Sequence, residues 1–209
     1  MPNRAKLGGM SETRDPFESM FATIAPTIDP PSTDGAFVRS LFAMRRLSKG
    51  EYYQRAGEVT THGGFVVRGC LRTYSIDPEG VESITFFSAE RSWVGDIQSA
   101  RTQQPTTYHV DAIEQAELLV ITLSDFDRLL ARFPVIARYY QLGLERSSAA
   151  RQRRISLALN STAEERYTDF IERSPSIAAR IPQHMLASYL GMTPETLSRV
   201  RRKRRAPEG

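Results

Sequence analysis

The spacing of hydrophobic residues divides the chain into three stretches. Near the N-terminus, apolar residues recur every three or four positions between the Asp15–Pro16 pair and Pro26, which predicts a short helix because that spacing places them on one face. From Ala36 to about Leu123, short apolar or alternating runs are separated by Gly, Pro and Asp, as is typical of β-strands. From Ser124 onwards the helical spacing returns. We therefore expect an α+β protein.

The β-rich stretch contains one clear hairpin signal. The residues DPEG at 77–80 lie between the runs LRTYSI and VESITFF, with Gly80 where a left-handed backbone is convenient. Further apolar runs, YHVDAI and AELLVITL, follow before residue 124. Strands at this density predict a closed or double-layered β-fold.

Two helices are predicted directly after the β-rich stretch. The first is short and has Ser124 or Asp125 as its expected N-cap. The second begins at Pro134 and continues to about Asn160 without another proline, with an apolar edge at intervals of three or four residues. A helix of this length can pack along its twin in a dimer or against the β-domain of its own chain, and the sequence leaves both open.

The segment from Gln183 to Arg202 has the spacing of a helix-turn-helix. Ala187 is small where the two helices would cross, and Gly191 suits a turn that needs a positive φ. Thr193 is a natural N-cap for the second helix, and Pro194 suits its first position. An ordinary helical hairpin has similar positions, but the basic run that follows favours DNA as the partner.

Charge and cysteine content narrow the possible classes of protein. Six of the positive charges lie between Arg199 and Arg205, so that with a net charge of +4 the rest of the chain carries −2. Such local basicity is typical of a protein that contacts phosphates with one end. Cys70 is the only cysteine, which excludes an intrachain disulfide, a cysteine-held zinc and a four-cysteine iron–sulfur cluster. We expect Cys70 to be a small buried hydrophobe and the setting to be cytoplasmic, with no membrane span.

Together, the β-rich stretch, the long helix and the helix-turn-helix resemble the Crp/Fnr family of bacterial transcription regulators over residues 17–205. The matching residues are Gly50–Glu51, Gly57–Glu58, Gly69, Gly80 and WVGD at 93–96. The resemblance implies a jelly roll (double-stranded β-helix) of the cyclic-nucleotide-binding type, a helix that forms a homodimer, and a helix-turn-helix that reads palindromic double-stranded DNA. RNA polymerase is a further implied partner.

The resemblance divides the chain into four parts. We expect residues 1–14 to form a flexible leader and 15–133 the jelly-roll sensor domain. Residues 134–160 would form the dimerisation helix, and 161–209 the helix-turn-helix domain with a basic tail. No sequence remains for the β-hairpin wing of longer relatives, so the basic residues are expected to take over its phosphate contacts.

The residues PETLSR at 194–199 are similar to the Fnr-type recognition pattern. This similarity implies that Glu195, Ser198 and Arg199 contact bases. Because Pro194 stands where the cyclic-AMP-receptor branch has an arginine, the implied half-site is closer to TTGAT than to TGTGA. The DNA backbone contacts are expected from Thr193, Thr196, Arg201, Arg202, Lys203, Arg204 and Arg205.

The effector of the sensor domain is not identified by the sequence. The family's cyclic-nucleotide binders hold the phosphate with an Arg-Ser or Arg-Thr pair about ten residues after the acidic residue of the Gly-Asp turn. Here that position has Thr106 and Thr107, and Arg101 could substitute only if the loop were rebuilt. We therefore expect neither a cyclic nucleotide nor a cofactor, and the sequence leaves open whether the domain binds another small molecule or serves only as the scaffold of a constitutive regulator. The pocket expected for such a molecule comprises Trp93, Gly95, Asp96, Thr106, Thr107, Tyr139 and Tyr140.

The competing interpretation is a small-molecule sensor or a cupin-like β-barrel whose C-terminal helices serve packing and not DNA binding. Cupins gather a His-x-His pair with Glu and a later His around one metal. Here His62 and His109 stand alone, so no metal site is predicted. The chain also has no nucleophile elbow and no phosphate-binding glycine loop, and no enzymatic activity is expected.

Overall fold

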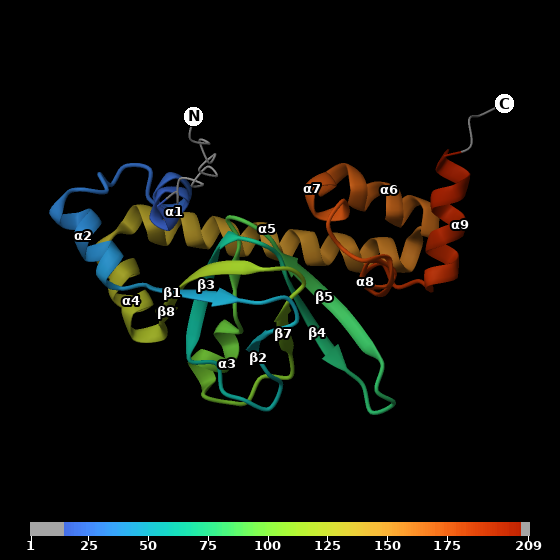
Figure 1. Ribbon diagram of the computed structural model, residues 1–209, viewed down its shortest axis with the longest axis horizontal. Coiled ribbons are helices and arrows are strands. Elements are labelled where there is room, and N and C mark those ends of the chain that lie inside the picture. The colour runs from blue at the N-terminus through green and yellow to red at the C-terminus, as the bar shows by residue number, and fades with distance from the viewer. Residues whose placement is uncertain (1–14, 206–209) are drawn as a thin grey trace, which may run out of the picture.

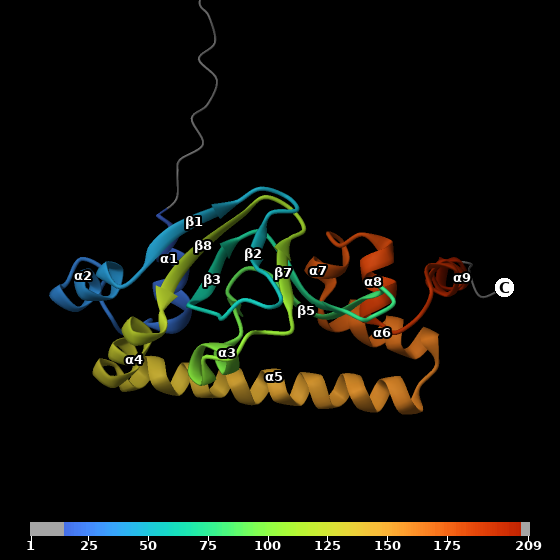
Figure 2. The same ribbon diagram turned by 90° about the horizontal axis from the view of Figure 1, so that it is seen from below.

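The computed structural model describes residues 15–205, and the predicted leader lies outside them. A long helix, α5 (Pro134–Asn160), runs along the molecule, with the β-domain against its first part and a helical C-terminal domain at its far end (Figure 1). Both domains lie on the same side of α5 (Figure 2). The predicted class, a β-domain joined by a long helix to a helical domain, is confirmed.

The β-domain is a jelly roll of two four-stranded antiparallel sheets. One sheet has the order β1 (Ala43–Leu47), β8 (Ala116–Thr122), β3 (His62–Arg68) and β6 (Trp93–Val94). The other has the order β2 (Tyr52–Gln54), β7 (His109–Ala112), β4 (Leu71–Ile76) and β5 (Glu82–Ser88). Alternate residues point inwards, so Val66 and Leu118 of the first sheet meet Leu71 and Val110 of the second in one buried cluster.

The β-domain begins later than the sequence pattern predicted. The expected start at Ala36 lies in helix α2 (Thr33–Ser40), because Ser32 caps that helix by accepting a hydrogen bond from Gly35 N, and Val38 packs into the core. Helix α1 (Pro16–Ile24) agrees with the prediction, including its N-cap Asp15.

Two further helices differ from the prediction in their limits. Helix α3 (Ile97–Thr102) interrupts the β-rich stretch, where only strands were expected. Helix α4 (Leu123–Arg132) has Thr122 as its N-cap, so the expectation of Ser124 or Asp125 was wrong. The Thr122 hydroxyl accepts a hydrogen bond from Asp125 N at 3.1 Å, which satisfies the donor that the helix leaves free.

Helix α5 has the predicted limits, and its first part follows one of the two predicted packing alternatives, contact with the β-domain of its own chain. Its first turns pack against the chain's own β-domain, where Ile136 is buried and Tyr139 and Tyr140 are half-buried. Its second half keeps apolar side chains in solvent, with Ile155 60% and Leu159 77% exposed. Among the described residues, no helix is both long and apolar enough to cross a membrane.

The C-terminal domain consists of α6 (Ala163–Arg173), α7 (Pro175–Ala178), α8 (Gln183–Tyr189) and α9 (Pro194–Arg205). The capping box of Thr162 and Glu165 at the start of α6 is present as predicted. Residues 203–205, expected as a basic tail after the predicted helix-turn-helix, continue α9 as helix, because Arg and Lys have a good helix propensity.

Helix α8 docks on the outer edge of β5 (Figure 2). The Ser188 hydroxyl accepts a hydrogen bond from Ile84 N at 3.1 Å and donates one to Glu82 O at 3.0 Å. Arg154 of α5 donates to Thr85 O at 2.7 Å, next to a register shift in the β4–β5 pairing. These side chains satisfy backbone groups that an edge strand would otherwise leave open.

Apolar packing and ion pairs complete this contact between the domains. Ile84 and Phe87 of β5 belong to one buried cluster with Leu186 and Leu190 of the helical domain. Beside the cluster, Arg180 forms ion pairs with Glu90, at 2.7 Å, and with Glu114. The β-domain and the helical domain therefore share a continuous hydrophobic core.

Candidate DNA-binding helix and effector cavity

The two helices α8 and α9 have the packing that the predicted helix-turn-helix requires. Ala187 is fully buried where they meet, and Gly191 adopts a φ of 63° in the turn. The Thr193 hydroxyl caps α9 by accepting a hydrogen bond from Thr196 N at 3.2 Å. Leu197 and Val200 are buried beneath α9, so its opposite face is turned to solvent.

That outward face brings together the three residues predicted to contact bases. Glu195, Ser198 and Arg199 are exposed and line a shallow surface groove together with Pro194 and Arg202. Hydrogen bonds from the backbone N–H of Glu195 and from the Thr193 side chain lower the pKa of the Glu195 carboxyl. It is therefore ionised at neutral pH and can act only as an acceptor.

The residues predicted to contact the DNA backbone differ in their surroundings. Arg202 and Arg204 are exposed and form no ion pair within the described part of the chain. Lys203 pairs with Glu164 of α6 at 2.7 Å, which raises the pKa of Lys203, so it would have to exchange this partner for a phosphate. Arg201 is half-buried, and Thr196 accepts a hydrogen bond from Arg199 at 3.4 Å. The Arg205 side chain lies outside the described atoms.

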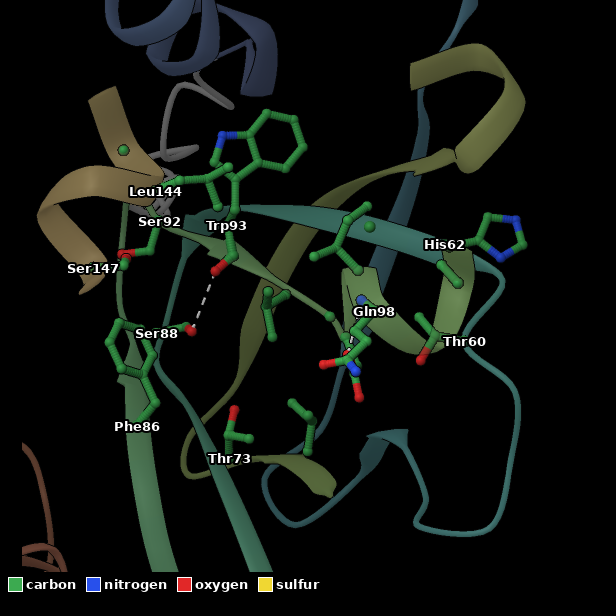
Figure 3. A pocket seen from close by; sticks show the side chains of 18 of the residues that line it. Thr60, His62, Thr73, Phe86, Ser88, Ser92, Trp93, Gln98, Leu144 and Ser147 are labelled. Carbon is green, nitrogen blue, oxygen red and sulfur yellow. Dashed lines mark hydrogen bonds between the residues drawn. The ribbon is translucent and has the colours of Figure 1, made fainter. Parts of the chain in front are cut away.

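A cavity of about 770 Å³ lies between the jelly roll and α5. Figure 3 shows Trp93, Leu144 and Ser147 on one side of it and Thr60, His62 and Gln98 on the other. Five of the seven residues predicted for an effector pocket line it, namely Trp93, Gly95, Asp96, Tyr139 and Tyr140. Its volume is in the range of small-molecule sites.

Thr106 and Thr107 do not line this cavity. Thr106 is buried and donates a hydrogen bond from its hydroxyl to the Asp96 carboxylate at 2.8 Å, and Thr107 is exposed. Asp96 also accepts from Gln98 N and Ser99 N, at 3.0 and 3.1 Å, as the N-cap of α3. Asp96 and Thr106 therefore hold the turn and the helix in place.

The inner wall of the cavity is aromatic. Trp93 packs against Phe65 and Phe126 with ring centroids 5.6 and 5.5 Å apart, and Tyr140 contacts Phe126 at 4.8 Å. Such tilted and edge-on pairs hold the rings in fixed orientations. Because Tyr140 belongs to α5, this aromatic wall connects the jelly roll to the long helix.

The mouth of the cavity has three arginines that the sequence reasoning did not identify: Arg91, Arg146 and Arg151. Arg91 follows β5, whereas the other two come from α5, so no local motif could have grouped them. Arg101, the arginine that the sequence did offer, pairs with Asp127 at 2.6 Å and does not line the cavity.

His109 and Cys70 occupy structural positions, whereas His62 is exposed and lines the cavity. His109 accepts a hydrogen bond from Ala56 N at 3.3 Å and stacks on Tyr74. Among the described residues, no group of three or more His, Cys, Asp or Glu side chains is placed to hold a metal. Cys70 is fully buried, as predicted, and burial raises the pKa of its thiol to about 12, which disfavours the reactive thiolate.

Comparisons with known proteins agree with this geometry. The family model of the cyclic nucleotide-binding domain matches residues 44–133. The chain is 31% identical over 168 residues to the transcriptional activator protein FnrA of Stutzerimonas stutzeri, covering 75% of this chain and 68% of that protein. It is 28% identical over 167 residues to the transcriptional activator protein Anr of Pseudomonas protegens, with the same coverage of each.

A solved structure has the same fold. FixK2 from Bradyrhizobium japonicum superposes with a TM-score of 0.67 at 18% identity, covering 78% of this chain and 83% of that one. Jelly roll, long helix and C-terminal helices therefore form an arrangement that occurs in other proteins as well.

Proposed function

Because the chain belongs to the Crp/Fnr family of transcription regulators, we propose that two copies of it read a palindrome with TTGAT-like half-sites. Family membership makes the chain a DNA-binding transcription regulator. Our proposal goes beyond family membership in four respects: the half-site, the residues that read it, the dimer and the effector.

The base-reading proposal rests on one observation, the exposed group of Glu195, Ser198 and Arg199 on the face of α9 opposite its buried residues. An arginine can donate two hydrogen bonds to O6 and N7 of guanine, and a glutamate can accept from the amino group of cytosine or adenine. Ser198 would contact a neighbouring base. Helix α9 lies at the end of the molecule, away from the jelly roll (Figure 1), where a duplex can reach it.

The alternative, in which the C-terminal helices only pack, accounts for α8 but not for α9. Helix α8 does dock on β5. Helix α9, however, presents charged and polar side chains to solvent, among them Arg199, Arg202 and Arg204. A helix with this composition gains little from packing, and its charge suits a phosphate backbone.

The dimer is supported by the exposed apolar edge of α5. Ile155 and Leu159 are four residues apart and therefore lie on one face, and neither is covered within the chain. Packing this edge against a second copy would remove it from water. The two α9 helices would then enter successive major grooves about 34 Å apart.

The cavity is the proposed effector site, because its walls come from both the jelly roll and α5. A ligand that fits one placement of α5 better than another would shift the dimer towards or away from the spacing that DNA requires. A cyclic nucleotide is not proposed, since no arginine follows the Gly-Asp turn at the phosphate position. RNA polymerase is the further partner that such a regulator would engage.

Selection of binding sites from random DNA, followed by affinity measurements on single-base variants, tests the base-reading proposal. We expect a palindrome to be enriched, and Arg199→Ala to lose about 1–3 kcal/mol of discrimination at one guanine position. As a control, Arg204→Ala should weaken binding to all sequences alike and reduce the salt slope by about 1. Enrichment of no palindrome, or an equal loss for all sequences in Arg199→Ala, would contradict the proposal.

A further inference from the structure

The charges around the effector cavity are mostly positive and lie at its mouth. Arg91, Arg146 and Arg151 line it and are exposed, and the only carboxylate among the lining residues, Asp96, is held by α3 and Thr106. Within the described part of the chain, none of the three arginines forms an ion pair. By contrast, Arg72, Arg101 and Arg180 each have a carboxylate partner. The mouth therefore holds positive charge that is not neutralised within the chain.

The position of Arg91 is conformationally costly. Its φ of 67° lies in the left-handed region, which a glycine would adopt without strain. The turn is fixed by hydrogen bonds from Arg91 N to Val66 O at 2.9 Å and from Ser92 N to Ala89 O at 3.1 Å. The backbone thus holds an arginine at the cavity mouth despite the strain.

Arg91 and Arg146 line the same cavity from different elements, the turn after β5 and helix α5. Tyr139 is partly buried, and burial raises the pKa of its hydroxyl, while the positive charges of Arg146 and Arg91 act in the opposite direction. Arg91, Arg146 and Tyr139 all line the cavity. Two guanidinium groups without a carboxylate partner, one from a turn and one from a helix, favour the binding of an anionic group beside this lining.

The buried part of the cavity lining carries no positive charge. Val94, Val110 and Ile121 are almost fully buried and line it together with Trp93 and Phe126, and the buried polar side chains of Gln54, Thr60 and Ser88 line it as well. None of the buried lining residues is an arginine or a lysine. A phosphate placed there would be desolvated without a cation, whereas a hydrocarbon body would gain from burial.

From this polarity, and resting on the proposed effector role of the cavity, we propose that the effector is an apolar carboxylate. Its aromatic or branched hydrocarbon body would occupy the inner part, and its acid group would bind Arg91 and Arg146 at the mouth. A cyclic nucleotide has the reverse requirement, because the family binds its charged phosphate inside the jelly roll.

The position of Arg151 indicates whether the ligand should strengthen or weaken the dimer. It lies one turn from Ile155 and seven residues from Leu144, which places all three on one face of α5. In a dimer formed through this face, Arg151 would meet like charges of the second copy. An anion at the mouth reduces that repulsion, so the ligand should strengthen the dimer and its binding to DNA.

Trp93 allows occupancy of the cavity to be measured directly, because it is the only tryptophan in the chain and lines the cavity. The probes are 8-anilino-1-naphthalenesulfonate, whose sulfonate stands in for the carboxylate, and the neutral N-phenyl-1-naphthylamine, which has the same aromatic frame. Energy transfer from Trp93 to each probe is titrated on the full chain. We expect the anionic probe to bind about tenfold more tightly, as a charged hydrogen bond would provide.

Substitutions at the mouth separate the contribution of charge to probe affinity from the contribution of apolar contact. The double variant Arg91→Gln, Arg146→Gln should lose about tenfold in affinity for the anionic probe and remain within about twofold for the neutral one. Arg138→Gln, on the same helix but outside the cavity lining, should change neither. The absence of energy transfer to either probe, equal affinity for both probes, or an unchanged affinity of the double variant would overturn the proposal.

Competition identifies the class of ligand. Phenylacetate and 4-phenylbutyrate should displace the anionic probe, and cyclic AMP should do so only at much higher concentration; the reverse order would overturn the proposal. The DNA selection described above is independent of this test. If the DNA selection enriches a palindrome but the cavity does not prefer the anionic probe, only the carboxylate proposal is refuted. If the cavity prefers the anionic probe but no palindrome is enriched, the proposed DNA-reading function is refuted.

Discussion

Gly69 and Gly80 share a left-handed backbone but differ in what surrounds them. Gly69 has a φ of 96°, and a Cβ added there would lie 2.6 Å from Gln115 O and 2.7 Å from Ala116. Gly80 has a φ of 84°, and nothing lies within 4 Å of its added Cβ. The two positions therefore separate the cost of the backbone conformation from the cost of a steric clash.

Substitution of each glycine by alanine tests this separation. We expect Gly80→Ala to lower the free energy of unfolding by about 1–2 kcal/mol, the cost of a left-handed residue with a side chain. Gly69→Ala should lose a further 1–3 kcal/mol, roughly, because the backbone at residues 115–116 must move. Urea denaturation of both variants checks the difference. Equal losses would show that the close approach at Gly69 relaxes without cost.

Single residues also show what the sequence could and could not predict. Thr193, Pro194 and Gly191 follow local rules of capping and turn geometry, so their roles were predicted. Arg91 was missed because it lines the cavity together with residues of α5, and nothing in its sequence neighbours indicates that. Thr106 was assigned to the pocket by counting along the chain, whereas its hydroxyl turns to Asp96.

At the scale of elements, the contact of α8 with β5 joins the helix that supports α9 to the strand that borders the cavity. Thr85 and Phe86 line the cavity, and the adjacent Ile84 N–H donates to Ser188 of α8. Arg154 holds the carbonyl of Thr85 from α5. A shift of β5 on ligand binding would therefore displace its contacts with both α5 and α8.

Labelling of Cys70 can measure how firmly these elements are docked. Cys70 belongs to the hydrophobic cluster shared with α8, and the charge of Arg180 acts on it. We expect Arg180→Gln and Ser188→Ala to speed its reaction with a thiol reagent at pH 8 by about tenfold, since each removes a hydrogen bond across the contact.

Ser148→Ala, an exposed serine on α5, is the matched control and should leave the labelling rate unchanged. Because burial raises the pKa of the Cys70 thiol to about 12, labelling of the docked state should stay slow up to pH 9. Unchanged rates in both interface variants would mean that docking does not protect Cys70.

The sequence predicted the limits of the helices and strands better than it predicted the contacts between them. Pro134 and the absence of another proline before Asn160 predicted the limits of α5 correctly. The start of the β-domain was placed too early because the residues after Ser32 contain both apolar and polar side chains that suit a short capped helix as well. Ser188 docks on residues about a hundred positions earlier, and such pairings leave no periodic signal.

For the molecule as a whole, we expect the exposed edge of α5 to decide the state of assembly. The double variant Ile155→Glu, Leu159→Glu places charges on that edge, and we expect it to be monomeric and to lose its affinity for the palindrome. Because both side chains are exposed within one chain, the helix content should not change. Sedimentation equilibrium, circular dichroism and DNA titration measure the three quantities.

The control for this prediction is Ala149→Glu, which adds a charge at an exposed position on another face of α5. It should leave the dimer intact at the same protein concentration. A double variant that stays dimeric would place the interface elsewhere on the molecule.

The hydrophobic cluster shared by β5 and α8 also determines how this regulator can be divided or recombined. A fragment that ends at Asn160 would uncover Ile84 and Phe87 along an unpaired strand edge, which favours aggregation. A chimera that joins this helix-turn-helix to the β-domain of a relative would need a compatible β5 as well as a matching junction. The unit that can be exchanged is therefore the helical domain together with the strand on which it rests.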